Sequence, residues 1–290
     1  MPDQIIKIVN KYDEALNKAD SEKYKLSIQL SLDGFSFCIF DEKTNKFLSI
    51  ESITIENPNR VDIFCSLIKQ FFSAHSWLNL KFKSTNIIYE TQKSTLIPSP
   101  LFDEAEKNTY SDFNFTPEED HCVYYDKLIS LDAFNLYTVP VQLKNTLNEL
   151  FQDHKLLSHS GSLIESLLIL YKNLPVQKRV FVNVRKSNLD IVITEGKKLL
   201  YFNSFTYTTK EDFIYYGIFV LEQLNLNPEE IELIFSGFIN KNTELFDIVY
   251  KYVRNVQFPK LTNTFRYSYI FNDIPSHYYF NLLNITLCEL

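Results

Sequence analysis

The chain has 290 residues, of which 45% are hydrophobic and 22% are charged, and its formal net charge is −7. This length and composition suffice for two domains with buried cores, which excludes the disordered and fibrous classes. Nucleic-acid binding needs a concentrated basic surface, and the sequence has no Lys/Arg-dense stretch, so we expect no nucleic-acid partner.

The N-terminal residues mix charged with apolar side chains, so they lack the continuous apolar segment of a signal peptide. No stretch of the sequence approaches the length of a membrane span. These features predict a cytoplasmic protein without membrane insertion. The cysteines lack C-x-x-C spacing, which predicts reduced thiols rather than disulfides or a metal site.

A three-stranded meander is predicted near the N-terminus, after a charged segment over residues 3–18 that is compatible with one helix. Residues 26–32 alternate strictly between leucine or isoleucine and serine or glutamine, which is typical of a half-buried strand. An Asp-Gly pair then predicts a turn into a second strand over residues 35–40. Residues 47–55 are predicted to form the third strand.

The middle of the chain is predicted to contain helices and shorter strands. Apolar residues at helical spacing indicate a helix over residues 64–78. Strands are predicted near residues 86–90 and 136–139, on either side of a polar, proline-containing region from 98 to 117. Two helices follow, and the second begins at a Ser-x-x-Glu capping pattern. The Asn-Leu-Pro sequence that ends it predicts a domain boundary.

The second half of the chain repeats the same order of elements. Strands are predicted over residues 180–184, 189–193 and 199–208, and Thr209 with Asp212 matches a capping box that begins a helix. A further strand ends at a Ser-Gly pair, and another helix follows it. The meander, helix, strand and helix thus occur twice without a shorter period, which indicates a duplication of two units.

This duplicated plan resembles the actin-like ATPase superfamily, which includes actin, sugar kinases, and bacterial pilus-assembly and cell-division ATPases. Residues 26–40 are the most recognisable segment, and they look closest to an uncharacterised bacterial family assigned to that fold. The resemblance covers the whole chain and implies an α/β protein with the duplicated actin-like (ribonuclease H-like) fold. It implies two subdomains with mixed sheets flanked by helices, residues 1–175 with an N-terminal helix and residues 176–290, which face each other across a cleft.

In such ATPases the first hairpin turn reads Asp-x-Gly-Thr/Ser, where the Asp holds hydrated Mg²⁺ and the Gly lets backbone amides approach the phosphates. The corresponding stretch here runs from Ser31 to Gly34. Strand phase places Ser31 at the Asp position and Asp33 at the Gly position. A shift by two residues restores Asp33 but places Phe35 where the Gly belongs. Either alignment damages the phosphate site that the resemblance implies.

The second turn reads Asp-x-Gly-x-Gly-Thr-Thr-Asp in the superfamily, and the matching segment here begins at Asn183 and ends at Asp190. Arg185 and Ser187 replace the two glycines, and the metal-side Asp is an amide. The adenosine loop is normally Gly-Gly after a strand. Here it retains Gly237, which is followed by a phenylalanine.

Phosphoryl transfer depends on positioned charge around Mg²⁺ and phosphate, so three altered loops predict a pseudo-ATPase without a cofactor. Such a protein would be a scaffold for a protein partner. In the alternative, the chain binds or hydrolyses ATP with Mg²⁺, and Arg185 and Lys186 pair with the anion; both can also be solvated turn residues. The candidate positions in these loops are Ser31, Asp33, Gly34, Asn183, Arg185, Lys186, Asp190 and Gly237.

Other clusters of reactive side chains favour structural roles. His154 and His159 are five residues apart, whereas zinc ligands on a helix prefer a spacing of three or four. The serines after His159 lack a Gly-x-Ser-x-Gly elbow. The acidic run before His121 is typical of a solvated loop. We therefore predict no catalytic residue and no metal ligand, although an unrelated enzyme with residues 98–117 as a lid is a third hypothesis.

Overall fold

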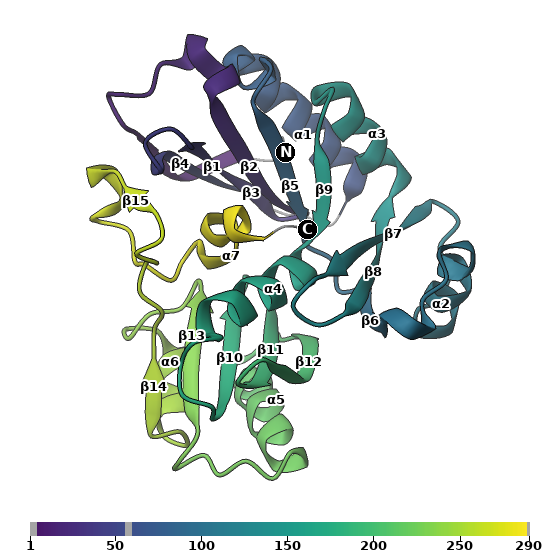
Figure 1. Ribbon diagram of the computed structural model, residues 1–290, viewed down its shortest axis with the longest axis vertical. Coiled ribbons are helices and arrows are strands. Elements are labelled where there is room, and N and C mark those ends of the chain that lie inside the picture. The colour runs from purple at the N-terminus through teal and green to yellow at the C-terminus, as the bar shows by residue number, and fades with distance from the viewer. Residues whose placement is uncertain (1–4, 56–59, 289–290) are drawn as a thin grey trace. The chain divides into compact units, whose positions relative to one another are not determined.

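The computed structural model describes residues 5–55 and 60–288, which form an α/β structure (Figure 1). These residues divide into two compact units. The first comprises the chain up to residue 163 together with 263–273 and 281 onward, and the second comprises 164–262 and 274–280. Each unit contains a mixed sheet flanked by helices, as the sequence predicted.

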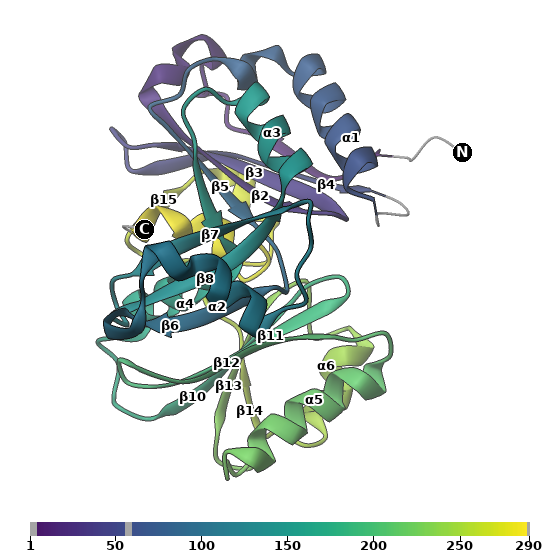
Figure 2. The same ribbon diagram turned by 90° about the vertical axis from the view of Figure 1, so that its right-hand side faces the viewer.

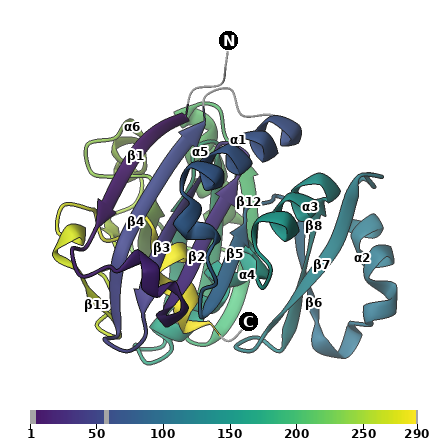
Figure 3. The ribbon, with the colours of Figure 1, turned by 90° about the horizontal axis from the view of Figure 1, so that it is seen from above.

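A mixed sheet of seven strands, counted among the described residues, forms the centre of the first unit. The strand order is β1-β4-β3-β2-β5-β9, of which Figure 3 shows β1 to β5, and the two-residue β15 pairs with β4. The predicted meander is β2, β3 and β4, which are antiparallel, whereas β5 and β9 run parallel to β2. The strands are β1 (Ile5–Tyr12), β2 (Tyr24–Ser31), β3 (Gly34–Asp41), β4 (Lys46–Ile55), β5 (Ser84–Tyr89), β9 (Lys155–Ser158) and β15 (Arg266–Tyr267).

The N-terminal segment is a strand, so the predicted helix over residues 3–18 is wrong where the structure describes it; residues 3 and 4 lie outside the described part. Residues 5–12 pair antiparallel with β4. Isoleucine and valine make up half of this segment, and such β-branched side chains favour strands. The Tyr12 hydroxyl also donates a hydrogen bond to the buried Glu51 carboxylate of β4. The ladder with β4 therefore decides the conformation.

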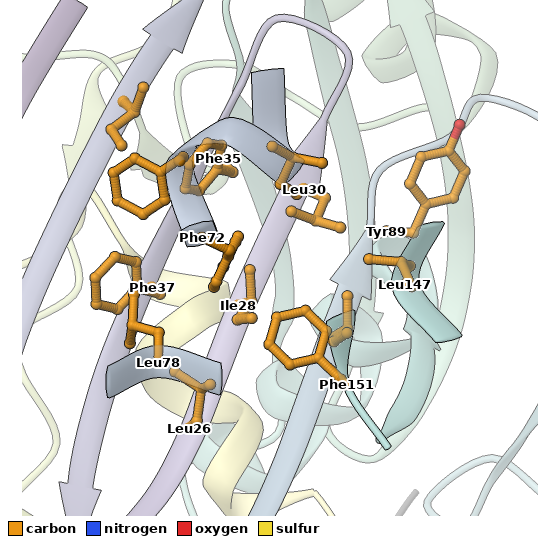
Figure 4. Close-up of a cluster of buried hydrophobic side chains, with 14 of the residues drawn as sticks. Leu26, Ile28, Leu30, Phe35, Phe37, Phe72, Leu78, Tyr89, Leu147 and Phe151 are labelled. Atoms are coloured by element: carbon orange, nitrogen blue, oxygen red, sulfur yellow. The ribbon is translucent and has the colours of Figure 1, made fainter. Parts of the chain in front are cut away.

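Helices α1 (Val61–Ala74) and α3 (Val141–Leu150) lie side by side on one face of this sheet (Figure 2). Their apolar sides and the inward side chains of β2 and β3 form a continuous core (Figure 4). Leu26, Ile28 and Leu30 are at most 1% exposed, so the predicted alternation correctly identified the buried side of β2. Phe72 of α1 and Leu147 of α3 pack in the same core.

The polar region from 98 to 117 contains a helix, α2 (Lys107–Asn114), and adjoins a small antiparallel sheet of order β6-β8-β7. Its strands are β6 (Ser94–Pro98), β7 (His121–Leu128) and β8 (Ala133–Pro140). The ring of Phe102 stacks on that of Phe134 with centroids 4.0 Å apart and lies 4.9 Å from that of Tyr125. This aromatic cluster attaches the segment to the small sheet.

The second unit contains a five-stranded sheet of order β12-β11-β10-β13-β14 (Figure 1). The meander β10-β11-β12 is antiparallel, and β13 and β14 continue the sheet in parallel. The predicted capping box of Thr209 and Asp212 is confirmed at the start of α5. The elements are β10 (Lys178–Val184), β11 (Asn188–Glu195), β12 (Lys198–Thr206), α5 (Lys210–Gln223), β13 (Glu232–Gly237), α6 (Glu244–Tyr250) and β14 (Asn255–Gln257).

Two helices lie near the boundaries of the compact units, α4 (His159–Tyr171) and α7 (Phe280–Asn284). The predicted domains, residues 1–175 and 176–290, remain a prediction about which parts of the chain fold independently. The two compact units have different boundaries. C-terminal residues return to the first unit because Phe265 packs against Phe40 and Phe47, with ring centroids 5.2 and 5.4 Å apart. Chain order alone therefore does not define the units.

A buried carboxyl group joins the small sheet to the main sheet of the first unit. Asp126 of β7 accepts a hydrogen bond of 2.7 Å from the Ser158 backbone amide. The Tyr137 hydroxyl lies 3.4 Å from its other oxygen. Burial raises the pKa of Asp126 to about 7, although the Ser158 amide, the charge of Lys155 and the Tyr137 hydroxyl oppose this shift.

We expect the Asp126 carboxyl to make stability depend on pH. A raised folded-state pKa stabilises the protein at low pH, and this contribution is lost as the pH rises through about 7. The loss between about pH 6 and pH 8 is about 1.4 kcal/mol. In Asp126→Asn this loss should disappear, as measured by urea unfolding at both pH values. Burial lowers the pKa of His277, so the contribution of this side chain to stability rises with pH, and it does so equally in both proteins. Parallel pH profiles of the two proteins would contradict the assignment.

Gly217 of α5 is a position at which alanine should stabilise the protein. Its position borders an apolar void of about 20 Å³, and a Cβ there would meet no atom within 4 Å. Alanine has a helix propensity about 1 kcal/mol better than glycine, so Gly217→Ala should raise the free energy of unfolding by about that amount. Gly161 of α4 is the matched control, because its Cβ would lie 3.2 Å from the Asn135 amide nitrogen. Thermal denaturation should show a gain for Gly217→Ala and none for Gly161→Ala; the reverse order would refute the packing argument.

Candidate functional site

The first candidate loop is a two-residue turn between β2 and β3, in which Ser31 pairs with Gly34. The Ser31 hydroxyl donates to the Asp33 carboxylate, and the Asp33 carbonyl accepts a hydrogen bond of 2.9 Å from the Ile55 amide. Gly34 has a φ of +153°, and a Cβ there would lie 2.2 Å from the Ile53 carbonyl oxygen. The close approach of β4 therefore explains this glycine without a ligand.

The second candidate loop contains a buried ion pair. The Asp190 carboxylate, 1% exposed, accepts two hydrogen bonds from the Arg185 guanidinium, at 3.0 Å from Nε and 2.6 Å from Nη2. The Asn183 side-chain amide donates to the same carboxylate at 3.0 Å. Such a bidentate, charge-assisted arrangement fixes the planes of both groups.

This ion pair belongs to a larger polar network on β10, β11, β12 and β13. The Ser236 hydroxyl donates to the Asn183 side-chain oxygen at 3.1 Å, and Arg185 Nη2 donates to the Ser204 hydroxyl at 2.8 Å. The Tyr207 hydroxyl donates to the Arg185 carbonyl oxygen at 2.7 Å. Arg185 is therefore buried, and the hypothesis that it is a solvated turn residue is wrong. Lys186, in contrast, is exposed.

The third candidate loop is closed by main-chain hydrogen bonds. Gly237 has a φ of +81°, and a Cβ there would lie 2.1 Å from the Val184 carbonyl oxygen. The Gly237 amide donates to the His277 carbonyl oxygen, and the Phe238 amide donates to that of Val184, both at 2.8 Å. These two amides thus have acceptors within the protein, and the glycine is required by the approach of β10.

The structure brings the candidate residues of the second unit together. Asn183, Arg185 and Asp190 share one network, and Val184 is the register partner of Gly237. Ser31, Asp33 and Gly34 form their own turn in the first unit. Sequence reasoning missed Ser204 and Tyr207. The signal that could have found polar partners is Asp190 itself, because a charged residue within an apolar strand needs them when buried.

The remaining candidates have structural surroundings. His159 is 2% exposed, and its Nδ1 lies 3.0 Å from the Asn281 side-chain nitrogen. His154 Nδ1 contacts the Phe151 carbonyl oxygen at 3.1 Å. Within residues 5–55 and 60–288, no group of three or more His, Cys, Asp or Glu side chains is arranged to hold a metal ion.

A polar groove lies between α1 and α3 in the first unit and has a volume of about 530 Å³. Its lining includes Ser66 and Lys69 of α1 and Gln142 and Asn145 of α3. Gln142 and Asn145 are exposed and are one helical turn apart. Their side-chain amides carry both hydrogen-bond donors and acceptors, so this part of the groove lining presents both kinds of group.

Comparisons with solved structures confirm the predicted actin-like fold. A Bacteroides thetaiotaomicron VPI-5482 protein with an actin-like ATPase fold and unknown function is similar at a TM-score of 0.80 and 27% identity, covering 94% of this chain and 99% of that one. A chain of the PilM–PilN type IV pilus biogenesis complex is similar at a TM-score of 0.58 and 9% identity, covering 91% and 97%. At that identity the second likeness shows the fold alone.

The family of the chain is also defined. Residues 13–256 match the model of DUF3822, described as a protein of unknown function, and the chain belongs to this family. No curated protein matches the chain. Among the described helices, none combines the length and the apolar character needed to cross a membrane.

We expect the Arg185–Asp190 pair to be essential for stability. Arg185→Met leaves the Asp190 carboxylate buried without its cation, which typically costs about 3–5 kcal/mol. Lys186→Ala is the matched control, because Lys186 is exposed and the change should stay within about 0.5 kcal/mol. Urea unfolding measures both.

The double variant Arg185→Met with Asp190→Leu separates a lost ion pair from lost packing. Replacement of both charged groups by apolar side chains should recover most of the stability that Arg185→Met loses. Equal losses in the single and double variants would contradict the role of the ion pair.

Proposed function

We propose that this chain is a non-catalytic actin-like protein, a pseudo-ATPase that serves as a scaffold for a protein partner. The observation that carries the proposal is the network of Asn183, Arg185 and Asp190, because it occupies the turn that the actin-like resemblance assigns to phosphate and Mg²⁺. A turn stabilised by its own ion pair folds without a nucleotide.

The donors and acceptors of this turn bond to one another, whereas a metal–phosphate site needs groups that are free to bind the ion and the phosphate. Mg²⁺ is bound by oxygen ligands, whereas the Asn183 amide group donates to Asp190 and its oxygen accepts from Ser236. Phosphates need free backbone amides or cations. The Arg185 amide donates to the Asn188 carbonyl oxygen at 2.8 Å, and the Arg185 side chain is neutralised by Asp190.

Two observations support a protein partner. One structure with the same fold is the PilM–PilN complex, in which an actin-like fold occurs together with another protein. The groove between α1 and α3 offers the exposed amides of Gln142 and Asn145, which can bind the main chain of a polar peptide. This surface lies within the first unit and does not use the altered loops.

A scaffold without a nucleotide site should show no thermal shift with ATP and Mg²⁺. A ligand at 100 times its dissociation constant stabilises a protein by about 2.7 kcal/mol, which is easily detected. We expect millimolar ATP–Mg²⁺ to leave the melting temperature unchanged. A saturable shift would overturn the proposal in favour of an ATP-binding protein.

Asn183→Asp extends the same experiment. It restores the carboxylate of the superfamily motif, but it places a second negative charge next to Asp190. We expect this variant to melt at a lower temperature, to show no ATP-dependent shift and to hydrolyse ATP at background. Turnover above buffer controls would show that the site is dormant rather than dismantled.

A further inference from the structure

Strand β12 is an open sheet edge in the second unit. It pairs with β11 on one side and ends the strand order of its sheet (Figure 1). All its residues are exposed or half-buried. A bulge near Leu200 leaves residues 201–206 as the regular segment. On the outer side of this segment the Ser204 amide donates to the Asn203 side-chain oxygen at 2.9 Å, and no strand of the described chain pairs with the remaining outer backbone groups.

Beyond Lys198 and the bulge near Leu200, β12 lacks the features that usually protect such edges. Residues 199–209 contain no charged side chain and no proline. The other edge strands of the described chain differ: β1 carries Lys7 and Lys11, β6 ends at Pro98, β7 contains Asp126 and Lys127, and β9 and β14 are only four and three residues long. Charges, proline and short length are the common means of preventing edge pairing.

An exposed aromatic ladder lies beside this edge. The Phe205 ring of β12 stacks on Tyr216 of α5 at 4.6 Å, and Tyr216 contacts Tyr215 at 5.5 Å. Tyr215 stacks in turn on Phe219 at 6.0 Å. Tyr215 is 62% exposed and Phe219 is 41% exposed. Exposed tyrosine and phenylalanine side chains are enriched in protein interfaces.

We propose that β12 and the aromatic ladder of α5 form the interface of a symmetric dimer, so that the partner is a second copy of this chain. Antiparallel pairing of β12 with itself is two-fold symmetric and continues the sheet across both copies. The six residues of the regular segment, 201–206, give an edge of roughly 20 Å. The same symmetry brings the two copies of α5 together, and Tyr215 and Phe219 of each then cover the other.

Charge complementarity favours a second copy over another occupant. Lys197 and Lys198 are exposed at the start of β12, and the exposed Glu211 lies in the first turn of α5, just beyond its end. Antiparallel pairing places the start of one strand next to the end of the other. Lys198 and Glu211 have no ion-pair partner among the described residues, so each can pair across the interface.

Sedimentation equilibrium of the full chain tests this inference. We expect a mass of twice 34.2 kDa at micromolar concentrations, with dissociation on dilution. The variant with Tyr215→Glu and Phe219→Glu should raise the dissociation constant at least about tenfold. Tyr252→Glu is the matched control, because Tyr252 is an aromatic residue of the same unit with 51% exposure and should leave the dimer intact. Leu200→Lys gives a second disruption if the double variant does not fold.

A charge exchange tests the antiparallel orientation. Lys198→Glu should weaken the dimer, and its combination with Glu211→Lys should restore it. A wild-type chain that stays monomeric overturns the proposal, as does a dimer that Tyr252→Glu dissociates. A dimer that persists both in the Tyr215→Glu and Phe219→Glu double variant and in Leu200→Lys also overturns the proposal. The dimer contact uses β12 and α5 rather than the candidate nucleotide loops, so the oligomeric state and any shift with ATP are two separate measurements.

Discussion

The buried carboxylate of Asp190 is the constraint on which the second unit depends. It lies in β11, opposite Asn183 of β10, where the neighbouring side chains are apolar and the strands are covered on their faces. An uncompensated charge at such a position is costly, so its partners must come from nearby strands. Arg185 supplies the cation and Asn183 supplies an amide. The conformation of the turn between β10 and β11 follows from these bonds.

That requirement leaves little freedom for a ligand in the same place. The guanidinium of Arg185 already has two bonds to Asp190 and one to Ser204, and its main-chain carbonyl accepts from Tyr207. A phosphate could reach this arginine only in competition with a bidentate carboxylate that is part of the folded sheet. The affinity of such a site would be reduced by the cost of opening the network.

The sequence predicted the meanders well, because alternation over residues 26–32 is a local signal with a direct structural meaning. The sequence also located the second candidate loop, but it did not identify Asp190 as the partner of Arg185. That pairing depends on the length of the turn and on the strand register, which together place Asp190 beside Arg185. The first strand was missed because residues 5–12 extend only through pairing with β4, some forty positions away. The return of Phe265 to the first unit rests on long-range packing that no local pattern contains.

The glycines show why motif residues alone cannot decide between a binding loop and a structural turn. Gly34 and Gly237 both stand in loops that the superfamily uses for nucleotides, yet a Cβ at either position would lie close to 2 Å from a carbonyl oxygen of a neighbouring strand. Each glycine is thus required by the sheet whether or not a ligand binds. The informative positions are 183 and 190, which act as a pair: the superfamily motif has a carboxylate at both, whereas here the side-chain amide of Asn183 donates a hydrogen bond to the Asp190 carboxylate. The amide at 183 and the arginine at 185 satisfy Asp190 together, so the three residues specify a closed turn more strongly than the remaining glycine specifies an open one.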